Sequence, residues 1–169
     1  MTSDINRLHQ EADQFFARGD LARAREIYLT ILHLDPRNAQ ATNRLGAILA
    51  EEGDLSAAEP LFRQALELDP AMAAAWSNLG NLHYSRSDWD EAVACYRKAL
   101  DLDPDYATAH NNLAAAYKKM GRLGDAVTEL KKAQRLGLRS LSRPPQAKEG
   151  TGGGLFGWRR RKGEKAPRQ

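Results

Sequence analysis

The pentapeptide LDLDP at Leu100–Pro104 has two near-copies earlier in the chain, LELDP at Leu66–Pro70 and LHLDP at Leu32–Pro36. Each of these three prolines follows the one before it by 34 residues. A fixed period of this length is typical of tandem helical repeats. A fourth copy would fall at Gln134–Leu138, where the chain instead reads QRLGL.

The same period runs through residue types that a pair of packed helices needs. Along it lie Gly19, Gly53, Ser87 and Gly121, then Ala24, Ala58, Ala92 and Ala126, and then Tyr28, Phe62, Tyr96 and Leu130. Glycine followed by Asp, as in Gly53–Asp54, suits a helix end followed by the N-cap of the next helix. The pair Asp69–Pro70 is expected to repeat this cap between units, with the proline in the first turn of the following helix. Each unit is therefore predicted to be two helices.

One helix pair cannot bury its apolar face alone, so the pairs must stack on one another. The predicted fold class is all-α: a right-handed α-solenoid of four helix-turn-helix units, or eight helices. The units are predicted at residues 5–38, 39–72, 73–106 and 107–140. Gln134 replaces a leucine that only a following unit could cover, and Gly137 is expected to stop the last helix. That helix is then left exposed, or is covered by a partner or by a second copy of the chain.

These residues resemble the tetratricopeptide repeat, whose pattern is matched best by WSNLGNLHY from Trp76 and by Ala92, Tyr96 and Pro104. The resemblance covers residues 5–140. Departures from the family pattern are Leu8, Glu11 and Ala12 in the first unit and His83 in the third. A terminal repeat is often atypical because one of its sides faces solvent.

The resemblance implies a concave groove lined by the first helix of each unit, and amide side chains dominate that lining. The predicted peptide-groove residues are Asn43, Arg44, Asn78, Asn81, Asn111 and Asn112. An asparagine carries both donors and an acceptor, so a row of them can hold the backbone of an extended peptide. The row is similar to that of repeat arrays preceding the catalytic domain of O-linked N-acetylglucosamine transferases. Alternatively, these amides bond only to a neighbouring helix or to water.

Composition excludes several classes of function. The single cysteine, Cys95, and four scattered histidines form no cluster at metal-ligand spacing, so neither a disulfide, a metal nor a cofactor is expected. No nucleophile, acid–base pair or phosphate-binding loop is present as a constellation, so the chain is predicted not to be an enzyme. The N-terminus lacks the pattern of a signal peptide and no apolar run approaches a membrane span, so a cytoplasmic location is expected.

The charge of the chain is divided unevenly. Residues 1–140 hold 17 Lys and Arg against 20 Asp and Glu, whereas residues 141–169 hold 8 against 2. This basic Pro- and Gly-rich tail is predicted to be disordered. Within it a docking patch is predicted at Leu155, Phe156, Trp158, Arg159, Arg160, Arg161 and Lys162. The patch fits peripheral attachment to an anionic membrane or an acidic protein better than it fits nucleic acid, and a merely solubilising terminus, the commonest role of a basic end, stays open beside them.

The sequence therefore predicts a scaffold or adaptor that binds a protein or extended peptide in its groove and is localised by its tail. The alternative is a regulatory or targeting subunit of an enzyme assembly, in glycosyl transfer or envelope biogenesis, whose partner supplies the chemistry. Self-association through the uncovered last helix is a further alternative.

Overall fold

The computed structural model describes residues 2–141, and within that range it contains eight α-helices and no strand. The helices are α1 (Thr2–Arg18), α2 (Leu21–Leu34), α3 (Ala39–Glu51), α4 (Leu55–Leu68), α5 (Ala73–Arg86), α6 (Trp89–Leu102), α7 (Ala107–Lys119) and α8 (Leu123–Leu141). The predicted tail patch from Leu155 to Lys162 lies outside the described residues. None of the helices within residues 2–141 is long and apolar enough to cross a bilayer.

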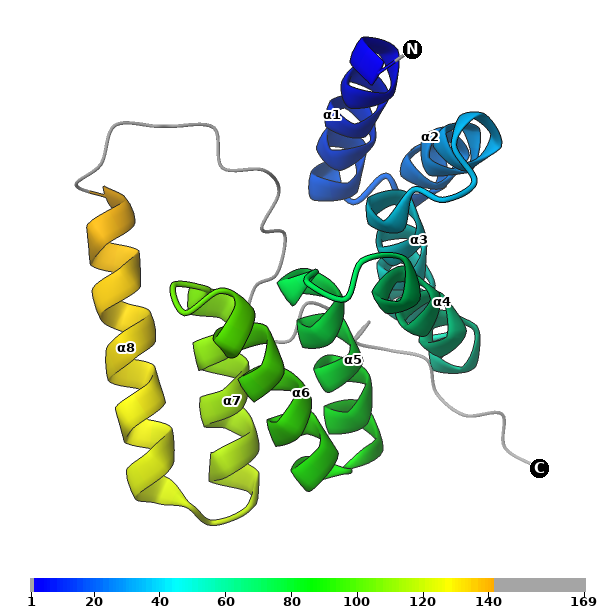
Figure 1. Ribbon diagram of the computed structural model, residues 1–169. Helices are drawn as coiled ribbons and strands as arrows, with labels where there is room; N and C mark the ends of the chain where they lie inside the picture. Colours follow the sequence, from blue (N-terminus) through cyan, green and yellow to red (C-terminus); the bar gives the residue numbers. More distant parts are fainter. Residues whose placement is uncertain (1, 142–169) are drawn as a thin grey trace, which may run out of the picture.

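Consecutive helices pack as pairs, and the pairs stack in chain order from α1 and α2 at one end to α8 at the other (Figure 1). The first helices also contact one another, α3 with α5 and α5 with α7. They therefore form the inner layer of the stack, with the second helices outside it. This arrangement confirms the predicted all-α solenoid class, while the exact unit boundaries stay a prediction.

The turns inside the units follow the predicted cap chemistry in part: Asp20 and Asp54 cap α2 and α4, whereas the Asp88 side chain makes no cap bond to α6. Gly53 has a φ of 92° and Ser87 adopts the same left-handed region at 69°. Asp54 then caps α4, because its carboxylate accepts a hydrogen bond from the Ala57 backbone amide at 3.0 Å. A residue that tolerates positive φ, followed by an acidic cap, ends one helix and starts the next.

The connections between the units differ from the prediction. Asp69 does not cap the next helix: its carboxylate accepts from the Ala71 amide two residues on, at 3.0 Å, and Pro70 lies in the connection. Asp35 and Asp103 make the same bond to the amides two residues after them, at 3.2 and 3.1 Å. Each LDP motif thus closes a tight turn before the following helix begins, as short acidic side chains commonly do.

The core is built from buried aromatic rings, two of which lie against glycines. Tyr28, Phe62 and Tyr96 are fully buried. A Cβ atom added at Gly80 would lie 2.6 Å from the Tyr96 ring, and one at Gly46 would lie 2.7 Å from the Phe62 ring. The missing side chains therefore let the two helices of a unit approach closely.

The last helix is longer than predicted. α8 continues through Gly137 to Leu141, so Gly137 does not stop it. This glycine is exposed and lacks the positive φ of the turn glycines, and a helical glycine costs only about 1 kcal/mol. The prediction was wrong because a glycine ends a helix only where it adopts the left-handed conformation.

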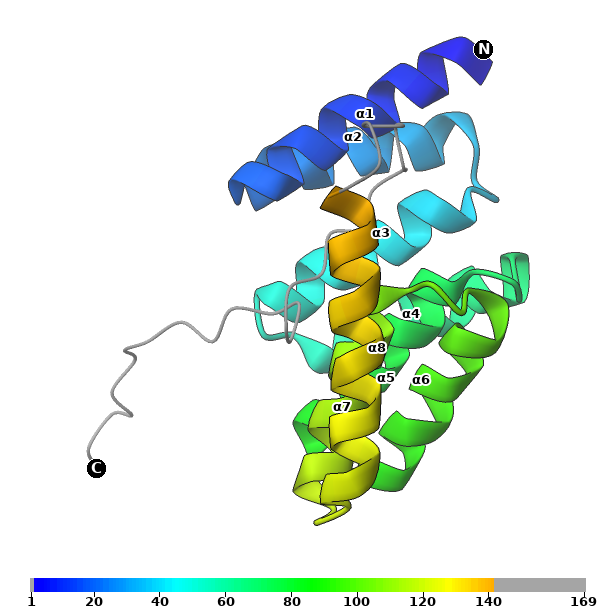
Figure 2. The same ribbon diagram turned by 90° about the vertical axis from the view of Figure 1, so that its left-hand side faces the viewer.

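One face of α8 has no cover within the described residues. Leu123, Val127 and Leu130 form an outer stripe along it and are 62%, 49% and 47% exposed. In α6, the residues equivalent to Val127 and Leu130 are Val93 and Tyr96, which are 8% and 0% exposed. In Figure 2, α8 stands in front of the other helices with no further helix laid against this end of the stack.

Candidate functional site

Most of the predicted groove residues lie where successive first helices meet. Three polar contacts join these helices in turn: Asp13 with Arg44, Asn43 with Asn78, and Asn81 with Asn112, at 3.0, 3.0 and 2.8 Å. We call these six residues the polar seam. It ties α1 to α3, α3 to α5 and α5 to α7, so each joint of the inner layer has one such contact.

Two tyrosines reach the seam from the second helices. Tyr96 donates to the Asn81 carbonyl oxygen at 2.8 Å, and Tyr28 donates to the Asp13 carboxylate at 2.5 Å. Burial raises the pKa of both phenols far above the ordinary value, so both keep their protons and act as donors. Tyr96–Asn81–Asn112 thus repeats Tyr28–Asp13–Arg44 two units later, with neutral groups in place of an ion pair.

The predicted groove residues differ in what they can offer to a ligand. Asn43, Arg44, Asn81 and Asn112 are 4%, 9%, 6% and 1% exposed. Their side chains are committed mainly to the seam, which is the second interpretation that the sequence allowed. Asn78 and Asn111 keep part of their surface in solvent. Asn112 also holds a buried carbonyl oxygen with no hydrogen-bond partner within the described residues.

Asn111 is the equivalent of Asn43 at the end of the array. Asn43 accepts a hydrogen bond from Asn78 of the following unit. The described chain has no following unit beyond α8, so the Asn111 amide has no such partner within residues 2–141. Together, Asn78 and Asn111 are the two predicted residues whose amides an external polypeptide could reach.

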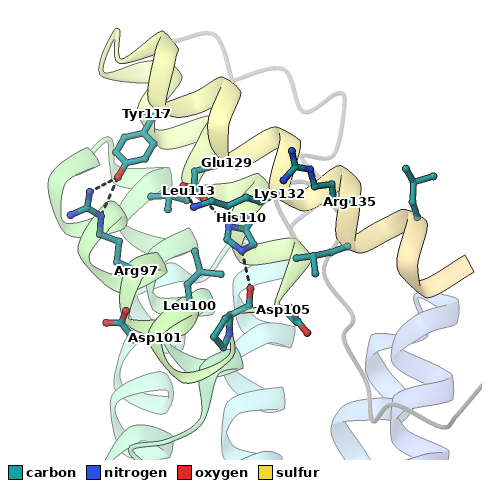
Figure 3. Close-up of a pocket in the computed structure, with 13 residues that line it drawn as sticks. Arg97, Leu100, Asp101, Asp105, His110, Leu113, Tyr117, Glu129, Lys132 and Arg135 are labelled. Atoms are coloured by element: carbon teal, nitrogen blue, oxygen red, sulfur yellow. Dashed lines mark hydrogen bonds and ion pairs between the residues drawn. The ribbon is translucent and has the colours of Figure 1, made fainter. Parts of the chain in front are cut away.

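A second feature, which the sequence analysis did not single out, is a cavity of about 1000 Å³ between α6 and α8. Its floor is α7, and its apolar lining includes Leu100, Leu113 and Leu136 (Figure 3). The last turns of α8 form one wall, and the end of α6 with the following connection forms the other. The cavity depends on residues from three helices, so no single stretch of sequence reveals it.

A buried ion pair anchors α8 beside this cavity. His110 Nε2 donates to the Pro104 carbonyl at 3.0 Å, as Trp76 Nε1 donates to the Pro70 carbonyl at 3.1 Å one unit earlier. The other ring nitrogen, Nδ1, lies 2.6 Å from the Glu129 carboxylate. His110 lies 34 residues after Trp76, and this spacing could have predicted from the sequence that both rings bond to the carbonyl of the preceding proline.

The charge of this pair follows from its surroundings. Burial alone would raise the pKa of Glu129, but hydrogen bonds from Lys132 and His110 outweigh it and hold that pKa below its ordinary value. A lowered pKa favours the ionised Glu129 carboxyl, which is an acceptor for the ring nitrogen 2.6 Å away.

No group of three or more His, Cys, Asp or Glu able to hold a metal ion is found among residues 2–141. Cys95 is buried, and burial raises the pKa of its thiol to about 11, so it carries little thiolate at neutral pH.

Comparisons with known proteins define the class of this chain. Three repeat-family models match it: one described as tetratricopeptide repeat at residues 9–73, one described as TPR repeat at residues 80–121, and another tetratricopeptide repeat model at residues 107–136. The chain belongs to the tetratricopeptide repeat family and is a protein-interaction scaffold. No curated protein sequence matches it.

Several solved structures share the fold. A crystal structure of MamA aligns with a TM-score of 0.66 at 24% identity, over 82% of this chain and 81% of MamA. MamA from Desulfovibrio magneticus RS-1 aligns at 0.64 and 25% identity, over 82% and 78%. A variant of the Thermobaculum terrenum O-GlcNAc transferase aligns at 0.65 and 30% identity, over 69% of this chain but only 22% of the transferase.

Proposed function

We propose that the chain binds an extended polypeptide along the inner surface formed by α1, α3, α5 and α7. The observation that carries this proposal is the pair of partly exposed amides, Asn78 in the polar seam and Asn111 in α7. Each hydrogen bond from a side-chain amide to a peptide backbone contributes about 0.5–1.5 kcal/mol net. Binding would therefore be weak at any one site and distributed along the surface.

An array of immobilised peptides, probed with the whole chain, tests this proposal. The variant Asn78→Ala/Asn111→Ala removes the two exposed amides and, with Asn78, its seam bond to Asn43, while the Asn81–Asn112 bond stays in place. We expect it to lose binding to most captured peptides. Lys98→Ala, on the exposed surface of α6, is the control and should bind as the wild type does. Equal capture by all three proteins would reject the groove.

A second candidate is supported by the likeness to the repeats of the O-GlcNAc transferase at 30% identity. The chain would then be a regulatory or targeting subunit, and its partner would supply the chemistry. Repeat folds of this kind are typically non-catalytic, and the absence of enzymatic activity here stays a prediction. Cross-linking of the whole chain in cells, followed by mass spectrometry, distinguishes the two, because a set of unrelated non-enzymatic partners would reject this candidate.

A cytoplasmic location with attachment through the tail belongs to the same proposal. It depends on residues 155–162, which lie outside the described part of the chain. Fluorescent fusions of the whole chain and of one lacking these residues would test it, and an identical distribution of the two would reject attachment.

A further inference from the structure

The cavity between α6 and α8 combines an apolar lining with a rim that carries both positive and negative side chains. Leu113 lies on the α7 floor and Leu100 and Leu136 on the two walls, while Asp101 and Asp105 lie on the α6 side (Figure 3). Its size is at the upper end of ordinary ligand pockets and accommodates several large side chains.

The cations of the rim are largely used within the chain, whereas the carboxylates on the α6 side are not. Arg97 donates to the Tyr117 hydroxyl at 2.7 and 3.1 Å, and Lys132 donates to Glu129 at 2.9 Å. Asp101 and Asp105 have no ion-pair partner within residues 2–141. Arg135 lies on the α8 side, away from Asp101 (Figure 3). An occupant that suits this rim combines large apolar groups with positive charges.

We propose that this cavity is a peptide-binding site and that its occupant is the chain's own segment Leu155–Lys162. The segment reads LFGWRRRK, with three large apolar side chains directly before four cations. Leu155, Phe156 and Trp158 would cover the leucines that line the cavity. The arginines would face Asp101 and Asp105. The match concerns the chemistry of the two halves of the segment.

The position of the tail favours this occupant over an external one. The chain continues from Leu141, and Arg135, Leu136 and Leu138 just before it already line the cavity. Residues 142–154 span up to about 3.3 Å each, or roughly 43 Å, against about 28 Å for the whole of α8. A tethered segment also acts at an effective concentration in the millimolar range, so modest contacts are sufficient. This inference goes beyond the groove and uses none of its amides.

Paramagnetic relaxation in the whole chain tests the proposal. A nitroxide is attached at Gly163→Cys in a Cys95→Ala background, directly after the basic run. We expect the amide signals of Asp101, Asp105 and Leu136 to lose most of their intensity, and those of the distant α2 to keep it. The variant Leu155→Ser/Phe156→Ser/Trp158→Ser should restore the lost signals.

Asp101→Lys/Asp105→Lys is a second variant that changes only exposed carboxylates, so its fold is expected to be intact, and it should also restore the signals. The proposal would be overturned if both variants still showed the selective loss of amide signal intensity. It would also be overturned if the chain with the unaltered tail showed no selective loss, whether or not that tail binds phosphatidylserine vesicles. A mixture of isotope-labelled chains and spin-labelled unlabelled chains completes the test. Loss that occurs between chains would assign the site to a second copy and overturn the intramolecular form.

Discussion

At the scale of single residues, the close approach of the two helices of a unit depends on a glycine in the first helix and an aromatic ring in the second. Gly80 is paired with Tyr96, and Gly46 with Phe62, each within one unit. In the last unit the same two places hold Ala114 and the smaller Leu130. The first unit holds Ala12 and Tyr28 at these places, both fully buried, so a glycine is not needed beside every ring.

Gly80→Ala is expected to destabilise the chain, although alanine favours a helix. The new Cβ would lie 2.6 Å from the fully buried Tyr96 ring, and such overpacking costs about 1–3 kcal/mol against about 1 kcal/mol of helix propensity. Urea unfolding measures the net loss. Gly124→Ala, whose Cβ would meet nothing within 4 Å, is the matched control and should gain stability. Equal stabilisation by both would show that the ring moves aside freely.

At the scale of single elements, α8 has two different faces. Its inner face is held by the Glu129–His110 pair and by Ala126 and Ala133, both 5% exposed. Its outer stripe has the apolar character of the equivalent face of α6 without the cover that α7 gives to α6. Within residues 2–141, the end of the array is therefore marked by the lack of a helix over this stripe of α8, and not by a break within α8.

Val127→Gln is expected to change the free energy of unfolding by less than about 0.5 kcal/mol, because the side chain is 49% exposed. Val93→Gln, at the equivalent place in α6, should cost several times more because that valine is covered by the next unit. Thermal unfolding of the two variants gives the comparison. A large loss from Val127→Gln would mean that the outer stripe is covered in solution.

The Glu129 ion pair should give α8 a dependence on acid pH. The pKa of Glu129 is lower in the folded chain than in the unfolded chain. As the pH falls between these two pKa values, the unfolded chain therefore takes up the proton first. Stability is therefore fully present above the ordinary carboxyl pKa and falls as the pH drops through the lower folded value. Glu129→Gln should cost about 1.5–3 kcal/mol at neutral pH and lose this part of the acid dependence.

Urea unfolding at a series of pH values measures this effect. Asp125→Asn is the control, because Asp125 pairs with Arg122 at the surface and both side chains are about half exposed. Such a pair contributes about 0–1 kcal/mol. An acid dependence that is the same in Glu129→Gln as in the wild type would assign it to other groups.

At the scale of the whole molecule, the polar seam couples the units in series. Repeat proteins are stabilised by each unit and by its contact with the next, so a break at one joint should loosen one end more than the other. Asn81 is the strongest candidate for such a break, because its carbonyl oxygen accepts from both Tyr96 and Asn112.

Asn81→Ala should therefore leave two buried donors without their acceptor, at about 1–3 kcal/mol for each. Hydrogen exchange is expected to speed up in α7 and α8 more than in α1 and α2. Asn43→Ala is the control: it removes a single bond from Asn78, which is partly exposed and can bind water instead. Uniform acceleration along the chain would mean that the array unfolds as one unit.

The sequence by itself determined the helix pairs, their number and the class of fold, because the 34-residue period places caps and core residues at fixed intervals. These signals are local, so they can be read without a structure. The sequence-based predictions were wrong at Asp69, which closes a turn and does not cap a helix, and at Gly137, which does not end α8. The residue type alone determines neither the type of turn nor the sign of a φ angle. Only the tertiary structure decided that Asn43, Asn81 and Asn112 face neighbouring helices, and that α6 and α8 enclose a cavity over His110. Those features arise between units, where the packing of one helix on the next sets which side chains are covered.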